Sequence, residues 1–161
     1  ELLPEGISPE QAVLLLSRQK ADEVRQREFP GGGAVPETIV AADTVVAIDG
    51  EILGKPHSAE NAAEMLRRLS GREHSVYTGV TGISGEECVS FAERTAVEFY
   101  PLTGQEIAAY VATGEPMDKA GAYGIQGRGA LLVRRIDGDY YNVMGLPVGE
   151  LNQRLRAMGV N

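Results

Sequence analysis

An acidic residue lies inside an apolar stretch of the chain. In the segment AADTVVAIDG, Asp43 follows two alanines and precedes Thr44 and two valines. A buried carboxylate is costly unless a cation, hydrogen bonds or a metal ion compensates for the lost water. Asp43 therefore fits a metal ligand or a general base in a cleft. An acid at the end of a strand can also cap a neighbouring loop, and the residues alone leave both interpretations open.

Two lysines could neutralise an anionic ligand. Lys55 lies between Gly54 and Pro56, which restrict the backbone on either side and suit a side chain aimed at one place. Lys20 follows the segment LLLSRQ of an expected helix. Taken alone, each would be a solvated surface cation. Gathered around one site, both could hold phosphate oxygens.

The stretch GEPMDKAGAYGIQGRGA, residues 114–130, combines five glycines with several polar side chains. Glycine lets the backbone approach a flat ligand closely or adopt a positive φ. The stretch matches neither the phosphate-loop pattern nor the dinucleotide fingerprint. The amide of Gln126 offers donors and an acceptor, which suits the edge of uracil or thymine, where N3–H lies beside carbonyl oxygens. Spacing alone does not distinguish a base pocket from a tight structural turn.

The other residue types that often carry chemistry are isolated in this sequence. Neither His57 nor His74 has a partner at metal-ligand spacing. Cys88, the single cysteine, begins an expected strand without an adjacent base, so we expect it to pack rather than to act as a nucleophile.

Length and composition limit the function classes. A chain of 161 residues is expected to form one domain with a substantial core. The net charge of −8 argues against a nucleic-acid partner, which would require a basic face. We expect no contact with a membrane, because no segment approaches the roughly 20 apolar residues that a spanning helix needs. One cysteine permits no internal disulfide, and a cytoplasmic location fits.

Helix and strand signals alternate along the chain. We expect helices at residues 7–27, 58–71, 103–114 and 147–159. We expect strands at residues 38–48, 51–54, 74–83 and 88–100, and a further hairpin of residues 130–136 with residues 139–145. Because several strand pairs are joined by hairpin turns, these signals favour an α/β fold with a mixed sheet and flanking helices over a purely parallel sheet.

Four long motifs resemble, in order, those of the Maf family of nucleoside triphosphate pyrophosphatases. They are AADTVVAIDGEILGKP, AAEMLRRLSGREHSVYTGV, TGEPMDKAGAYGIQGRGA and GDYYNVMGLPV. The resemblance implies hydrolysis of a nucleoside triphosphate substrate to the monophosphate and pyrophosphate, with a divalent cation, Mg²⁺ or Mn²⁺, as cofactor. It also implies two lobes around a deep cleft, as in inosine triphosphatases, and leaves a homodimer open.

The resemblance assigns roles by position. It implies that Asp43 is the catalytic acid and a metal ligand, that Lys20 and Lys55 act on the phosphates, that Thr44 and Gln126 bind the substrate, and that Glu1 is a second metal ligand. The family opens with a strand and an S-x-S-P-R-R segment, whereas the ISP of residues 7–9 is followed by glutamate. We therefore expect a single Maf-like domain over residues 1–161 that lacks this opening segment.

The glutamine of the IQG motif indicates the substrate branch. A related branch that acts on 7-methyl-GTP carries glutamate at the position of Gln126, and a carboxylate accepts from the two adjacent donors of guanine. An amide instead matches the donor and acceptor of uracil and thymine. We therefore expect dTTP and UTP as substrates. The alternative is a nucleotide-binding regulator without turnover, because the family is named for an association with septum formation.

Overall fold

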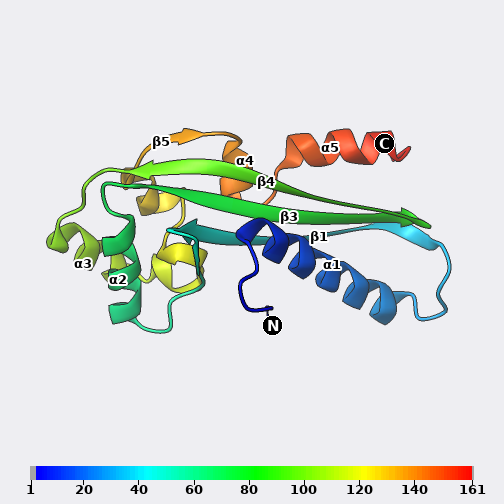
Figure 1. Cartoon of the computed structure of the whole chain (residues 1–161), viewed down its shortest axis with the longest axis horizontal. Helices are drawn as coiled ribbons and strands as arrows, with labels where there is room; N and C mark the ends of the chain where they lie inside the picture. Colours follow the sequence, from blue (N-terminus) through cyan, green and yellow to red (C-terminus); the bar gives the residue numbers. More distant parts are fainter. Residues whose placement is uncertain (1–2, 161) are drawn as a thin grey trace.

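The computed structural model describes residues 3–160 as an antiparallel sheet with flanking helices (Figure 1). The strands are β1 (Val35–Ile48), β2 (Glu51–Leu53), β3 (Glu73–Gly85), β4 (Glu87–Phe99) and β5 (Val133–Asp137). The helices are α1 (Pro9–Glu28), α2 (Ala59–Leu69), α3 (Gly104–Ala112), α4 (Tyr140–Met144) and α5 (Val148–Ala157). Three short 3₁₀ turns, η1 (Glu115–Asp118), η2 (Ala120–Ala122) and η3 (Gly127–Leu131), lie between α3 and β5.

The strand order is β2-β1-β3-β4-β5, and the predicted α/β class with flanking helices is confirmed. The structure differs from a mixed sheet in one respect, because all four strand pairs described are antiparallel. Strands β2 and β3 run in the same direction, but β1 lies between them. The helical connection through α2 therefore joins two parallel strands without pairing them.

Hairpin turns and helix caps occur where the sequence predicts them. Asp49 and Gly50 adopt positive φ angles of 53° and 76° between β1 and β2. Ser8 caps α1 in a capping box with Gln11, and the box of Thr103 with Glu106 opens α3. These local signals decide where the elements begin, so their positions follow from the sequence with little help from tertiary contacts.

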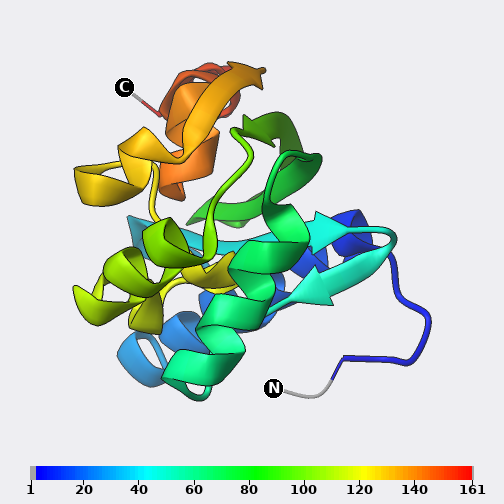
Figure 2. The ribbon, with the colours of Figure 1, turned by 90° about the vertical axis from the view of Figure 1, so that its left-hand side faces the viewer.

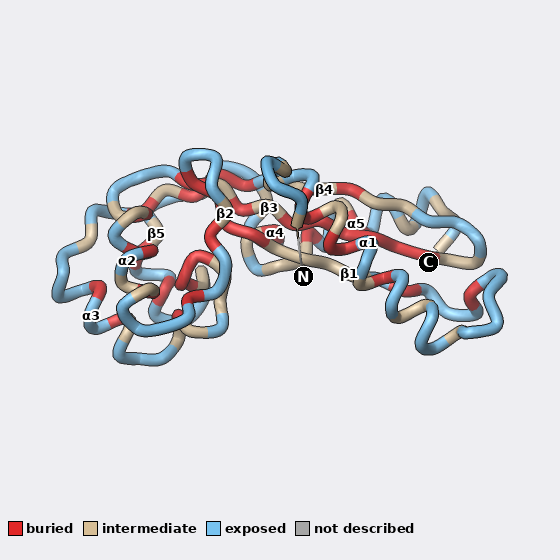
Figure 3. The backbone as a smooth tube through the Cα atoms, turned by 60° about the horizontal axis from the view of Figure 1, so that its bottom comes forward, coloured by how far each residue is buried: buried red, intermediate tan, exposed pale blue. Residues whose placement is uncertain are grey.

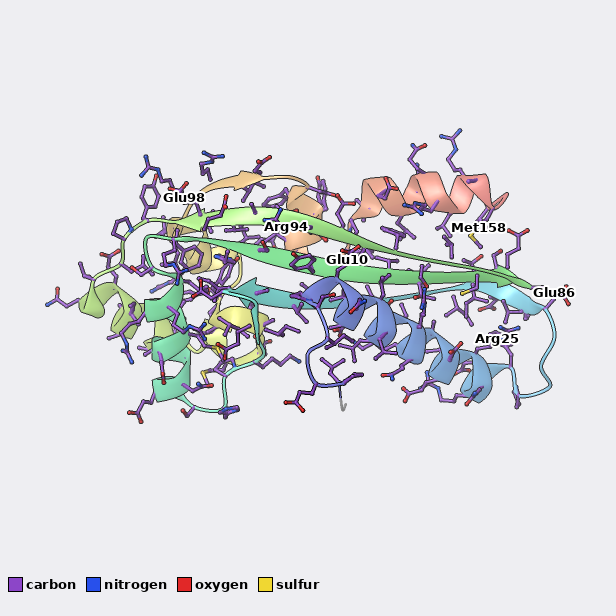
Figure 4. The ribbon with its side chains drawn as sticks, in the orientation of Figure 1. Glu10, Arg25, Glu86, Arg94, Glu98 and Met158 are labelled. Atoms are coloured by element: carbon purple, nitrogen blue, oxygen red, sulfur yellow. The ribbon has the colours of Figure 1, made fainter. Side chains whose placement is uncertain are left out.

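Helix α1 lies directly against the sheet. A Cβ atom built on Gly79 of β3 would come within 2.1 Å of the carbonyl oxygen of Val13, so only glycine permits this approach. Helix α5 lies on the opposite face, where Leu151 packs with Val80 and Phe91 (Figure 1). Glu86, at the tip of the β3–β4 hairpin, marks the end of the molecule away from α2 and α3 (Figure 4).

The largest hydrophobic core lies at the other end of the sheet, where α2 and α3 are in contact (Figure 2). It joins Leu66 and Leu69 of α2 to Phe99 of β4, all with exposures of 0–1%. Buried segments follow the strands, whereas the outer turns are exposed (Figure 3). This core fixes one end of the sheet beneath the glycine-rich segment.

Two sequence predictions are wrong. Residues 139–145 form no strand, because helix α4 occupies Tyr140–Met144, and β5 pairs with β4 instead. The side chain of Asp139 accepts from the backbone N–H of Tyr141, and Gly145 ends the helix with φ 115°. Cys88 does not pack, because it is exposed near the hairpin tip, beyond the core.

No helix within residues 3–160 is long and apolar enough to cross a bilayer. The two lobes, the likeness to inosine triphosphatases and the limits of the domain stay predictions.

Candidate active site

A pocket of about 370 Å³ opens between the middle of β1, the turn after β2, the glycine-rich segment and α4. Its volume lies within the range of small-molecule sites. The five predicted site residues that the structure describes all line it: Lys20, Asp43, Thr44, Lys55 and Gln126. Glu1, predicted as a metal ligand, lies outside the described residues. The pocket therefore brings these five residues together although they are up to 106 positions apart in the sequence.

The close approach of α1 to the sheet carries Lys20 to the acid. Asp43 pairs in register with Gly79, the residue on which Val13 of α1 lies. Lys20 lies two turns further along the helix, and its Nζ donates to Asp43 Oδ1 at 2.5 Å and to the carbonyl of Ala42 at 3.3 Å. The side chain of Asp43 is 17% exposed and that of Lys20 is 40% exposed. The carboxylate is thus paired with a cation and still reaches the pocket.

Two further lysines line the same pocket. Lys55 is exposed in the turn after β2. Lys119 donates to the carbonyl of Glu115 at 3.0 Å and to Asp118 at 2.9 Å. The pKa of Asp118 is lowered, mainly by its hydrogen bond and charge interaction with Lys119, and Lys55 contributes to the same shift. These lysines therefore add two further cations to the pocket that Lys20 lines.

Threonine hydroxyls connect the pocket to the core. Thr44 Oγ1 lies 2.8 Å from Thr78 Oγ1, which in turn donates to the carbonyl of Asn142 at 3.0 Å. Asn142 belongs to α4 and is fully buried. Its amide donates to the carbonyl of Val76 and to Thr95 Oγ1, at 3.2 and 3.1 Å. The amide therefore fixes α4, one wall of the pocket, against β3 and β4.

The carboxylate of Glu115 holds the glycine-rich segment. It accepts from the backbone N–H groups of Gly129 and Arg128 at 3.0 and 3.2 Å, and from Tyr110 Oη at 2.8 Å. Tyr110 Oη accepts in turn from the N–H of Gly124 at 3.1 Å. Burial alone would raise the pKa of Glu115, but these hydrogen bonds and the charge of Lys119 outweigh it, and the pKa is lowered.

Gln126 lies between these two anchoring points and is exposed at the pocket rim. Deeper in the pocket, Tyr123 is 5% exposed, and its Oη lies 2.5 Å from Nε2 of buried His74. Burial lowers the pKa of His74 to about 4, so this histidine is neutral at physiological pH. The segment thus presents a fixed backbone and one adjustable amide side chain.

No group of three histidine, cysteine, aspartate or glutamate side chains gathers anywhere in residues 3–160. Asp43 is the one carboxylate that lines the described part of the pocket, so it is the side chain that could bind a cation there. A single carboxylate suits Mg²⁺ or Mn²⁺ only if phosphate oxygens and water complete its octahedral shell.

Several functional candidates escaped the sequence interpretation. Lys119 could have been found from its place beside Asp118 in a glycine-rich stretch. Thr78 and Asn142 carry no such signal, because ordinary strand and helix segments contain them. The alternative that Asp43 caps a loop is not what the structure shows, since its described partner is Lys20.

The chain is similar to known proteins over almost its whole length. The sequence matches the family model described as Maf-like protein over residues 1–158. It is 52% identical to the dTTP/UTP pyrophosphatase of Carboxydothermus hydrogenoformans over 156 residues, which cover 96% of this chain and 81% of the relative. It is 49% identical to the dTTP/UTP pyrophosphatase of Bacillus velezensis over 160 residues, covering 99% and 82%. The protein of the same description from a Geobacillus species is 51% identical over 159 residues, covering 99% and 82%.

Proposed function

The chain belongs to the family of Maf-like proteins, and from that premise we propose that it hydrolyses nucleoside triphosphates, dTTP and UTP foremost, to the monophosphate and pyrophosphate. One observation carries the proposal: an acid, three lysines and a glycine-rich wall line one pocket. A triphosphate needs this combination, because its charge must be neutralised before water can attack phosphorus.

The lysines would bind the phosphate end of the substrate. Lys20, Lys55 and Lys119 approach the pocket from three different segments, so each can meet a different phosphate oxygen. When the anhydride bond between the α- and β-phosphates breaks, negative charge accumulates on the leaving pyrophosphate. Preplaced ammonium groups stabilise that charge without reorganising during the reaction.

Asp43 would handle the attacking water. Its carboxylate can accept a hydrogen bond from a water molecule in the pocket and take the proton as the water oxygen bonds to phosphorus. The bond from Lys20 to Oδ1 fixes the orientation of the carboxylate. A general base of this kind contributes on the order of 10²–10⁴-fold in rate.

The proposed cofactor is Mg²⁺ or Mn²⁺, held by Asp43 together with phosphate oxygens. The donors fit, because Mg²⁺ commonly binds one or two carboxylates plus substrate phosphates and water. When bound, the cation would neutralise phosphate charge and act as a Lewis acid. Glu1 stays a predicted second ligand.

The nucleoside would lie along the glycine-rich segment. Its backbone is held by Glu115 and Tyr110 on either side of Gln126. The amide of Gln126 can both donate and accept, as uracil and thymine require. Its exposure at the rim is consistent with a side chain that closes over the base when substrate arrives.

The test is pyrophosphate release from a panel of dTTP, UTP, dCTP and 7-methyl-GTP, with Asp43→Asn beside the natural protein. We expect the two 4-oxopyrimidine nucleotides to give the highest kcat/KM and Asp43→Asn to lose activity about 10²–10⁴-fold. Equal thermal melting would show that the variant is folded. Binding of dTTP without pyrophosphate release would instead favour the nucleotide-binding regulator. A cytoplasmic location, a homodimer and the absence of a nucleic-acid partner stay predictions.

A further inference from the structure

The hydrogen bonds behind the pocket have a defined direction. A threonine hydroxyl carries one proton and a carbonyl oxygen can only accept. The carbonyl of Asn142 lies 3.0 Å from Thr78 Oγ1 and also accepts from the N–H of Gly145 at 3.1 Å. Without the Thr78 proton between them, two oxygens would face each other in a buried site, which is costly. The proton of Thr78 therefore points to Asn142.

The direction of the first bond determines that of the next. Because the single proton of Thr78 is used, Thr78 Oγ1 accepts from Thr44 Oγ1 across 2.8 Å. The proton of Thr44 then points away from the pocket that Thr44 lines. Any hydrogen bond that the Thr44 oxygen makes to a ligand must then be one that it accepts.

Neighbouring bonds hold this arrangement in place. Thr78 and Asn142 are both 0% exposed, so water does not compete for their groups. The Asn142 amide is bound to Val76 and Thr95, and Thr95 Oγ1 donates to the carbonyl of Asp139 at 2.8 Å. The acceptor of the Thr78 proton therefore has little freedom to move.

We propose that Thr78 is a positioning residue that makes Thr44 a hydrogen-bond acceptor, so that the pocket selects nucleosides with a donor at this place. The proposal rests on the proposed function. The nucleoside part of dTTP has two donors, the N3–H of the base and the 3′-hydroxyl. If the donor is the N3–H, cytosine is disfavoured, because its N3 is an acceptor and would face the Thr44 oxygen.

The test measures kcat/KM for dTTP, for its 2′,3′-dideoxy analogue and for N3-methyl-dTTP. In the natural protein we expect one analogue to lose about ten-fold or more, because its removed donor leaves the Thr44 oxygen unpaired. The analogue whose loss depends on Thr78 identifies the donor to Thr44, because a lost contact with Gln126 would be lost equally in the natural protein and in Thr78→Val. In Thr78→Val the Thr44 hydroxyl can rotate and donate, so the loss of kcat/KM for that analogue should shrink to about two- to three-fold. Thr78→Ser keeps the hydroxyl and should return the loss to its natural size.

Thr81→Val is the matched control. Thr81 on the same strand is 1% exposed, and its hydroxyl is bonded to Ser17 and Ser90, with no bond to Asn142 or Thr44 in the described structure. We expect it to lower stability as Thr78→Val does while the discrimination between dTTP and its analogues stays at the natural level. Equal discrimination in Thr78→Val and the natural protein would overturn the proposal.

A second variant guards against a Thr78→Val protein that does not fold. Thr44→Val removes the acceptor directly, and it should abolish the natural discrimination. Retained discrimination in Thr44→Val would overturn the proposal by itself. Two results with the natural protein have different meanings. If it releases no pyrophosphate from dTTP, the proposed function fails. If it hydrolyses dTTP and both analogues equally well, only the role of Thr78 is contradicted.

Discussion

The loop at residues 31–33 and the segment at residues 121–129 are both rich in glycine, but the glycines of the two regions have different surroundings. A Cβ atom built on any of the three loop glycines would meet nothing within 4 Å. In the second segment, a Cβ on Gly121 would come within 2.8 Å of Val46, and one on Gly129 within 1.8 Å of the carbonyl oxygen of Gly124. The loop is open to solvent, whereas the segment is packed against itself and the sheet.

Glycine serves two purposes in these two regions. In the loop, Gly32 and Gly33 adopt φ angles of 71° and 77°, so their role is conformational. In the segment, absent side chains allow backbone, Glu115 and Tyr110 to come together and form a pocket wall. A glycine-rich sequence therefore does not by itself indicate flexibility, and the two segments should respond differently to the same substitution.

Gly129→Ala should have the largest effect. Its Cβ would collide with the backbone of Gly124 and with Tyr110 Oη, at 1.8 and 2.8 Å. Gly124 is bonded to Tyr110 and Tyr110 to Glu115, so neither can withdraw without breaking one of these hydrogen bonds. We expect a loss of at least about 3 kcal/mol in the free energy of unfolding, together with loss of turnover. Urea denaturation measures the first. A stable, fully active variant would show that the segment is looser than its contacts indicate.

Glu115→Gln should follow. The amide replaces one acceptor oxygen with an NH₂ group that faces N–H or O–H donors, and the charge is lost. We expect about 2 kcal/mol of destabilisation and a lower kcat/KM for dTTP, since the support of Gln126 is weakened. Glu64→Gln, on the exposed face of α2, is the control and should change neither quantity. Equal behaviour of the two variants would remove Glu115 as the anchor.

Acidification should weaken the packed segment through His74, which holds Tyr123. The unfolded chain takes up this proton near the ordinary pKa of 6.5, but the buried side chain does so only near pH 4. The contribution of neutral His74 to the free energy of unfolding is therefore fully present above pH 6.5 and is lost as the pH falls toward 4. Between pH 7 and pH 5 the loss in the free energy of unfolding should be about 2 kcal/mol.

Urea denaturation at several pH values tests this, with His74→Gln compared with His57→Gln. His74→Gln should flatten the pH dependence, and His57→Gln, at an exposed position, is the control for replacing a surface histidine. An unchanged slope in His74→Gln would contradict the assignment.

Gly31→Ala should have the smallest effect. Its Cβ would meet nothing within 4 Å, and its φ is not positive. We expect a change of less than about 0.5 kcal/mol in the free energy of unfolding and unchanged pyrophosphate release. A large loss would show that the loop is packed after all, which would remove the contrast with Gly129→Ala.

The sequence predicted what local chemistry decides. Ser8 and Thr103 cap helices, and Asp49 with Gly50 forms a turn, because each of these needs only neighbouring residues. The strand predicted for residues 139–145 is wrong. Two tyrosines and a valine favour a strand there. The cap of Asp139 and the buried hydrogen bonds of Asn142 stabilise a helix instead, and strand propensity takes no account of such contacts.

The same division applies to the pocket. Asp43 and Lys55 were identified because an acid in an apolar strand and a lysine between glycine and proline are unusual. Lys20 was assigned through the family resemblance. Its helix packs on Gly79, but a glycine in the sequence does not show which helix will contact it. Thr78 could not be predicted, because its role depends on a carbonyl 64 residues away.

These separations have a consequence for how the protein is made. The bonds of the pocket join residues 23, 34 and 64 positions apart, so each requires a large loop to close before its contact forms. Antiparallel sheets with such distant pairings fold more slowly than helical bundles. During synthesis, Thr44 and Thr78 leave the ribosome well before Asn142, and the hydroxyl chain cannot be complete until α4 has emerged and docked. A complete pocket should therefore appear only near the end of folding.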